Sequence, residues 1–405
     1  MSASRCELRA APLLLALGLF AACDGTRGPV LSIPTASRPK LLYIPSEEPT
    51  GLSGLTFLRD HIHEIEQLPF DGLAVDVGLG DAPWGDVQYT RAQFDAEVAM
   101  LQSIPFSKLT DNFEMFNVRT GGIGWFDDAA FAIVIENARV AAQVVRDGRL
   151  RGLFLDVNDY GDPVWSYPAA GESITFESYQ AKAHERGEAF MAALLAIDPE
   201  ITVMASVSYS EIFRSVCLEG VAFEEEGYRL LPAFLDGMAE ARAAAGVPAL
   251  IIDGFNGSYA ARDPRSFPLF RDLIQGNLAG VQARWFPGIE TYRFRKETVG
   301  WDAEPMLKCA DAVRAKLTRD MPSAFGVMVD YDTVLGRSFH LDAADFGMNF
   351  FTPDALTSTL TAALGSAERY VYVWSVSMDW LGVSTQPRPP DPYVRAVAAA
   401  RSGAP

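Results

Sequence analysis

The chain has 405 residues, of which 21% are charged, and its formal net charge at pH 7 is −18. An acidic surface repels phosphates, so the composition argues against nucleic acid as a partner and against an anionic polymer as a substrate. It fits a neutral or cationic ligand. The sequence has 4 histidines, and they form no cluster with zinc-ligand spacing, so we expect no metal and no cofactor.

Residues 1–22 have the features of a secretory signal peptide. Arg5 and Arg9 precede the apolar stretch APLLLALGLFAA, which is too short to span a membrane. The small residues before Cys23 resemble a bacterial lipoprotein signal, in which this cysteine becomes lipidated. We therefore expect residues 23–39 to be a lipidated N-terminus and flexible tether, and the protein to be anchored in a bacterial cell envelope, at the periplasmic or outer surface. The alternative is an ordinary signal peptide with a chance cysteine.

Residues 40–405 are expected to form a single domain and a monomer. No run in this part is apolar and long enough to span a bilayer. An oxidising compartment would allow Cys217 and Cys309 to pair, but two cysteines do not make a disulfide framework.

Short apolar runs alternate with stretches of helical periodicity along this domain. The runs predicted as strands are 41–45, 72–77, 112–118, 152–157, 201–207, 249–253, 324–330 and 370–375. The stretches predicted as helices are 55–69, 90–104, 127–145, 178–197, 230–245, 267–280, 352–364 and 392–401. Near-continuous apolar strands are typical of parallel sheets, and eight strand–helix units predict a (β/α)₈ TIM barrel. The alternative is an open doubly wound sheet, which the count of eight and the lack of a glycine-rich phosphate turn disfavour.

One interval is longer than a βα loop requires. About 70 residues separate Asp253 from Ala324, and they include Trp285, Tyr292 and Trp301. We expect an inserted loop region between the sixth and seventh strands, over the mouth of the barrel.

Polar residues gather where the predicted strands end. They are Asp76, Glu114, Asn117, Asp156, Asn158, Asp159, Ser208, Tyr209, Asp253, Asn256, Tyr259, Asp330 and Asp332. The carboxyl ends of barrel strands open onto one face, which carries the active site. Convergent carboxylates without a basic or thiol nucleophile indicate acid–base work on a glycosidic bond. The alternative role of such acids is to orient loops by accepting hydrogen bonds from the backbone.

Tryptophans also follow the strand ends. Trp84, Trp125 and Trp165 lie a few residues beyond three of them, and Trp374 lies in the last strand with Trp380 after it. Aromatic rings at a barrel mouth stack on sugar rings. The alternative is that they fill the top of the barrel.

At this point the chain resembles (β/α)₈-barrel glycoside hydrolases over residues 40–401. GLFLDVNDY is similar to their fourth-strand motif, where an Asn–acid pair carries the proton donor, here Asn158 and Asp159. VMVDYD is similar to the seventh-strand end that carries the nucleophile, and YVYVWS to the last strand, which places Trp374 in the sugar-binding floor. The resemblance implies cleavage of a neutral poly- or oligosaccharide. Both acid positions hold Asp where these enzymes usually have Glu, so a catalytically inactive carbohydrate-binding barrel and a metal-assisted barrel hydrolase remain alternatives.

The predicted site divides into two groups. The catalytic residues are predicted to be Asp156, Asp159, Asp330 and Asp332, with the fourth strand supplying the proton and the seventh the nucleophile or base. The predicted substrate-binding residues are Asp76, Trp84, Asn158, Trp165, Tyr209, Asp253, Asn256, Tyr259 and Trp374. Because Asp is shorter than Glu, we expect a wide gap between the acids and an inverting site, in which a water fits between them.

Overall fold

The computed structural model of the chain describes residues 38–46, 49–79, 83–119, 123–158, 164–167, 173–275, 321–331 and 339–403. The predicted signal peptide, the predicted lipidation site Cys23 and residues 276–320 of the long interval, with Trp285, Tyr292 and Trp301, lie outside these ranges. In the described part of the chain, no helix has the length and apolar character needed to cross a membrane.

The strands of the described residues form one parallel sheet of eight. They are β1 (Lys40–Pro45), β2 (Gly72–Val75), β3 (Phe113–Asn117), β4 (Gly152–Asp156), β5 (Thr202–Ala205), β6 (Leu250–Asp253), β7 (Ala324–Met328) and β8 (Tyr370–Ser375). Their order in the sheet is β6-β5-β4-β3-β2-β1-β8-β7. Because β1 pairs in parallel with both β2 and β8, the first and last strands lie side by side, as closure into a barrel requires.

The two end strands of this order, β6 and β7, meet at a narrow seam. A single parallel bridge joins Asp253 to Ser323. Beyond it, the segment that follows β6 contacts β7 in place of a strand, and Ser258 Oγ donates a hydrogen bond of 2.8 Å to the carbonyl of Gly326. The barrel is therefore nearly closed, with its weakest backbone pairing between β6 and β7.

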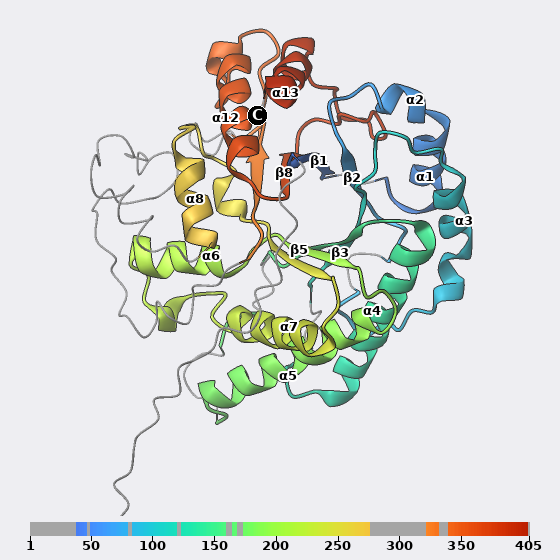
Figure 1. Cartoon of the computed structure of the whole chain (residues 1–405), viewed down its shortest axis with the longest axis vertical. Helices are drawn as coiled ribbons and strands as arrows, with labels where there is room; N and C mark the ends of the chain where they lie inside the picture. The colour runs from blue at the N-terminus through green and yellow to red at the C-terminus, as the bar shows by residue number, and fades with distance from the viewer. Residues whose placement is uncertain are drawn as a thin grey trace, which may run out of the picture. The chain divides into compact units, whose positions relative to one another are not determined.

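Helices surround the strands (Figure 1). The longer ones are α1 (Gly51–Asp60), α3 (Asp95–Ser103), α4 (Asp128–Gly148), α5 (Phe176–Leu195), α7 (Leu231–Ala245), α8 (Ser266–Ile274), α12 (Pro353–Ser366) and α13 (Asp391–Gly403). The shorter ones are α2 (Ile62–Ile65), η1 (Arg91–Phe94), α6 (Tyr209–Phe213), η2 (Arg214–Glu219), η3 (Phe223–Glu225), η4 (Asn256–Ser258) and η7 (Phe346–Met348). Figure 1 shows α12 and α13 side by side at the top, and α4, α5 and α7 together at the bottom. This alternation of strand and helix confirms the predicted (β/α)₈ barrel.

Two apolar layers follow from the alternation of side chains along each strand. One layer lies between sheet and helices and includes Leu153 and Leu155 of β4. The other fills the barrel interior and comprises Leu42, Ile44, Ala74, Phe113, Met115, Phe154, Met204, Ile252, Ala324, Met328, Tyr370, Tyr372 and Trp374. Strands buried on both faces explain the near-continuous apolar runs of the sequence.

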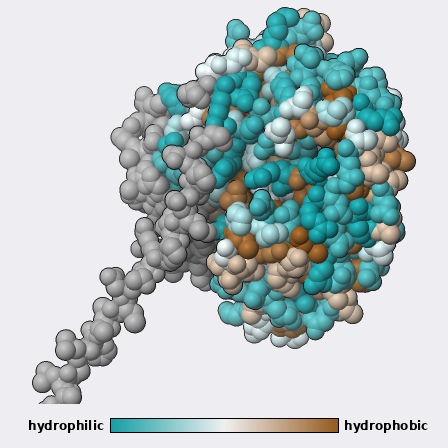
Figure 2. Space-filling model, turned by 45° about the vertical axis from the view of Figure 1, so that its right-hand side comes forward, coloured by the Kyte–Doolittle hydropathy of each residue, from teal (hydrophilic) through white to brown (hydrophobic). Residues whose placement is uncertain are grey.

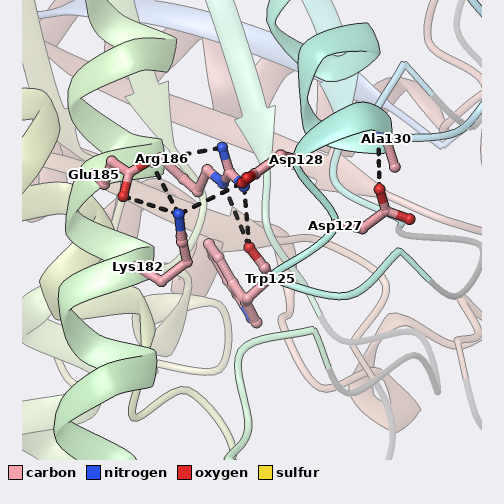
Figure 3. Close-up of polar contacts among 7 residues, drawn as sticks. All are labelled: Trp125, Asp127, Asp128, Ala130, Lys182, Glu185 and Arg186. Carbon is pink, nitrogen blue, oxygen red and sulfur yellow. Dashed lines mark hydrogen bonds and ion pairs between the residues drawn. The ribbon is translucent and has the colours of Figure 1, made fainter.

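The start of α4 is fixed by polar contacts with α5 (Figure 3). The Asp127 carboxylate caps the helix by accepting a hydrogen bond of 3.0 Å from the Ala130 N–H. Arg186 donates to the carbonyl of Trp125 over 3.3 Å and pairs with Asp128. The Arg186 guanidinium lowers the pKa of the Asp128 carboxyl. These contacts hold the loop after β3 against the helix layer.

Most element boundaries differ from the predicted ones by a few residues, and two of the differences affect the argument. The stretch 55–69 forms two helices, because the backbone leaves the helical conformation at His61 between α1 and α2. The seventh strand ends at Met328, before Asp330, because the chain turns there instead of pairing further.

Hydrophilic residues cover most of the face seen in Figure 2, in keeping with the acidic composition.

Candidate active site

The direction of a strand-end acid follows from its neighbours. Phe154 and Met328 belong to the barrel interior. Since side chains two positions apart on a strand share a face, Asp156, the last residue of β4, continues the interior face, whereas Asp330 lies in the turn two residues after the end of β7. Both are buried, at 2% and 0% exposure respectively. The carboxyl ends of the two strands therefore each carry one buried carboxylate.

Asp253 follows an apolar run of the same appearance but faces the other way. It is in register with Ala205, which is in register with Leu155 of the layer beneath the helices. Its carboxylate accepts a hydrogen bond of 2.7 Å from Ser210 Oγ and one of 3.3 Å from the Ser210 N–H, at the start of α6. Burial raises the pKa of Asp253 to about 6, although these hydrogen bonds lower it. Asp253 therefore lies between the sheet and the helices, where its hydrogen bonds attach the start of α6 to the end of β6.

Asp156 stands at the centre of a polar network. Its Oδ1 accepts hydrogen bonds from Ser206 Oγ at 2.9 Å, from the Asn158 N–H at 3.1 Å and from Asn158 Nδ2 at 2.5 Å. Asn256 Nδ2 in turn donates to Asn158 Oδ1 over 2.8 Å. Asn158 and Asn256, both predicted from the sequence, are therefore brought together at the predicted acid.

Asp330 has different surroundings. Its Oδ2 accepts hydrogen bonds from the N–H of Val376 at 2.8 Å, the N–H of Ser377 at 2.5 Å and Ser377 Oγ at 2.8 Å. Its Oδ1 is buried and has no hydrogen-bond partner among the residues that the structure describes. Burial raises the pKa of Asp330, and the three donors on the other oxygen only partly offset it. A carboxyl with one unpartnered, buried oxygen and a raised pKa is suited to hold a proton and donate it.

Aromatic rings line the interior beside these acids. The Trp374 ring lies 6.3 Å from the Phe154 ring and 6.1 Å from the Tyr259 ring, measured between centroids. Tyr259 covers Gly326, where an added Cβ would stand 2.1 Å from the tyrosine ring, so only glycine fits at that point of β7. Trp374 therefore belongs to the apolar interior of the barrel, and Tyr259 packs against it.

The other predicted tryptophans lie in the helix layer. Trp84 and Trp165 are 0% and 1% exposed, and their ring centroids are 6.0 Å apart. Trp125 joins them, at 5.6 Å from Trp165, and all three rings pack against Phe234 of α7. A fully buried indole offers no surface to a sugar, so we leave Trp84 and Trp165 out of the proposed site.

Two further predicted residues have local partners. Tyr209 is buried in the layer between sheet and helices, and its hydroxyl donates a hydrogen bond of 2.7 Å to Asp236 of α7. Asp76 follows β2 and accepts a hydrogen bond of 2.7 Å from the Gly78 N–H. Asp159 and Asp332, predicted as catalytic, lie outside the described residues. Within the described ranges, no group of three or more histidine, cysteine, aspartate or glutamate side chains is arranged to hold a metal ion.

Sequence reasoning missed Ser206, Ser377 and Tyr372. Ser206 and Ser377 supply hydroxyl donors to the two acids, and Tyr372 lies beneath Tyr259 with a ring-centroid distance of 5.9 Å. For Ser206 the available signal was its place directly after β5, one residue beyond Ala205. Ser377 lies in the loop after β8, and no sequence pattern predicts that its side chain points toward Asp330.

No protein-family model matches the chain, and no curated protein matches its sequence. Among solved structures, the chain is similar to a GH5-4 broad specificity endoglucanase from an uncultured bacterium, with a TM-score of 0.49 and 9% identity over 90% of this chain and 95% of that one. It is also similar to GH5_18 from Streptomyces cattleya in complex with GlcNAc, with a TM-score of 0.47 and 14% identity over 91% and 82%. A GH18 chitinase from Pseudoalteromonas aurantia matches with a TM-score of 0.40 and 11% identity over 89% and 99%. These three solved structures are glycoside hydrolases.

Proposed function

We propose that the chain is a glycoside hydrolase that cleaves a neutral poly- or oligosaccharide at the mouth of the barrel. The observation that carries the proposal is the contrast between its two buried acids. Three donors surround one oxygen of Asp156, whereas Asp330 is buried with an unpartnered oxygen and a raised pKa. Two carboxyl groups in such different environments suit an acid–base pair.

The surroundings suggest a role for each acid. Asp330 gives its proton to the glycosidic oxygen as the bond to the anomeric carbon breaks. Asp156, held by donors, acts on the opposite side of the sugar, either by taking a proton from the attacking water or by attacking the anomeric carbon itself. This assignment reverses the roles expected from the sequence. Trp374 and Tyr259 form the floor under the sugar ring.

A carbohydrate-binding barrel without catalysis is the second candidate. Asp330 is 0% exposed and Asp156 2% exposed, so a substrate reaches them only if their surroundings rearrange. If the two acids stay buried, the protein binds a glycan at the rim of the barrel mouth and does not cleave it.

Incubation with a panel of neutral polysaccharides and aryl glycosides tests the proposal. We expect release of reducing ends from at least one substrate, and loss of this release in Asp156→Asn and Asp330→Asn. Glycan binding without release, measured by calorimetry on the same panel, would favour the second candidate. Loss of activity in EDTA would instead favour the metal-assisted hydrolase.

We also propose that the protein is held in a bacterial cell envelope through Cys23. The motif before this cysteine and the tether after it support the proposal, and so does the disulfide bond of Cys217, because disulfides persist in oxidising compartments. Cys23→Ser should move the protein from the membrane fraction to the soluble fraction without changing its melting temperature. Mass spectrometry of the wild-type N-terminus tests whether Cys23 is lipidated. A mature chain without an acyl group would contradict the proposed anchor.

A further inference from the structure

A continuous series of hydrogen bonds leads from η4, which follows β6, to the acid at the end of β4. It begins at Asn256, whose Nδ2 donates to Asn158 Oδ1 over 2.8 Å, and continues from Asn158 Nδ2 to Asp156 Oδ1 over 2.5 Å. The Asn256 backbone N–H donates to the carbonyl of Ser206 over 3.1 Å, which ties Asn256 to the end of β5. The Asp156 carboxylate is thus linked to Asn256 through the Asn158 amide.

The amide of Asn158 has two orientations that differ in which atom faces Asp156. In the observed orientation its nitrogen faces the carboxylate and its oxygen accepts from Asn256. A rotated amide would set its oxygen against the carboxylate, acceptor against acceptor, and its nitrogen against the nitrogen of Asn256. Asn256 therefore selects the orientation in which Asn158 donates to the acid.

Ser206 reinforces the same orientation. Its hydroxyl gives its single proton to Asp156 over 2.9 Å and accepts from the Val157 N–H at 3.2 Å and from Asn158 Nδ2 at 3.3 Å. One donated and two accepted hydrogen bonds use the full capacity of a hydroxyl, so the serine cannot replace a donor lost from Asn158.

We propose that Asn256 is a positioning residue that acts on Asp156 through the Asn158 amide, keeping a donor on the carboxylate in its ionised form. The importance of Asn256 for catalysis rests on the proposed function above. The hydrogen bonds between Asn256, Asn158 and Asp156 can be tested whether or not the protein is active. The effect of Asn256 on stability should depend on the charge of Asp156, because a donor stabilises a carboxylate far more than a neutral carboxyl.

The test compares Asn256→Ala with the wild type at about pH 3 and about pH 7, on either side of the ordinary range for carboxyl groups. We expect a larger loss of melting temperature at the higher pH. In an Asp156→Asn background, the loss should be the same at both pH values. If Asn256→Ala does not fold, Asn256→Ser gives the same comparison, because its shorter side chain does not reach Asn158.

Asn349→Ala is the matched control, because the amide of Asn349 donates to the neutral hydroxyl of Tyr393 over 2.8 Å. The loss of melting temperature caused by Asn349→Ala should not change with pH. A pH-independent cost for the Asn256 variants, or a pH dependence that persists in the Asp156→Asn background, would overturn the proposal. The experiment uses no substrate, so a protein that cleaves no glycan overturns the proposed function alone. In an active enzyme, the acid limb of the kcat/KM profile of Asn256→Ala should move to higher pH.

Discussion

Tyr372 on β8 donates a hydrogen bond of 2.5 Å to the carbonyl of Gly254, which directly follows β6. The bond crosses the barrel interior and reaches one side of the seam where β6 and β7 share a single bridge. Burial raises the pKa of the Tyr372 phenol far above its ordinary range, so the hydroxyl keeps its proton and remains a donor. A buried side chain thus supports a seam that backbone pairing leaves weak.

Tyr372→Phe should destabilise the barrel through this bond. The substitution leaves a buried carbonyl without its donor, which costs about 1–3 kcal/mol in the free energy of unfolding. Denaturant unfolding measures the loss. Tyr370→Phe is the control, since its hydroxyl donates over 3.0 Å to the part-buried Asp111 and solvent can replace it there. A cost for Tyr372→Phe no larger than that for Tyr370→Phe would show that the bond does not support the seam.

Asp253 should make the stability of the protein depend on pH. Burial raises its pKa to about 6, above that of an aspartate in the unfolded chain. Between these values the folded protein holds a proton that the unfolded chain has released, so the free energy of unfolding falls as the pH rises from about 4 to about 6, by on the order of 3 kcal/mol. In Asp253→Asn this part of the pH dependence should disappear from unfolding curves measured across the window.

Ser210→Ala separates this effect from other acids. It removes a hydrogen bond that lowers the pKa of Asp253, so the loss of stability should extend to higher pH than in the wild type. If the slope of the free energy of unfolding against pH is unchanged in both variants, the pH dependence belongs to another group.

Eight strands followed by helices were predictable, because each apolar run and each helical period is a local property of the sequence. The direction of the strand-end acids was not. Asp156 and Asp253 both end apolar runs, yet one faces the interior and the other faces Ser210 behind the sheet. Strands buried on both faces show no alternation of polar and apolar residues, so nothing in the sequence marks which face a final residue joins. Loop residues such as Trp84 depend on tertiary packing, which no local pattern describes.

Trp84 and Trp374 should respond differently to truncation. Trp84 is 0% exposed within a cluster of aromatic rings, so Trp84→Ala should cost about 3–5 kcal/mol in the free energy of unfolding. The glycan affinity of the molecules that stay folded should be unchanged. Trp374→Ala should lower glycan affinity as well as stability, because this ring lies in the proposed floor of the site. Calorimetric titration of both variants at a temperature where each is folded makes the comparison, and an equal loss of affinity would contradict the assignment.

The roles of Asp330 and Asp156 predict opposite responses to the leaving group. An acid is needed most when the departing alcohol is a poor leaving group, so Asp330→Asn should lose about two to four orders of magnitude in turnover on an oligosaccharide. It should lose much less on a dinitrophenyl glycoside, whose leaving group departs without a proton. Asp156→Asn should be slow on both substrates, because activation of the attacking group is still missing. Asp128→Asn, at the start of α4 where the carboxylate pairs with Arg186 of α5, serves as the control and should keep wild-type turnover on both. If the dinitrophenyl substrate restores Asp156→Asn instead of Asp330→Asn, the two roles are exchanged; if both variants keep wild-type turnover on the oligosaccharide, neither acid takes part in catalysis.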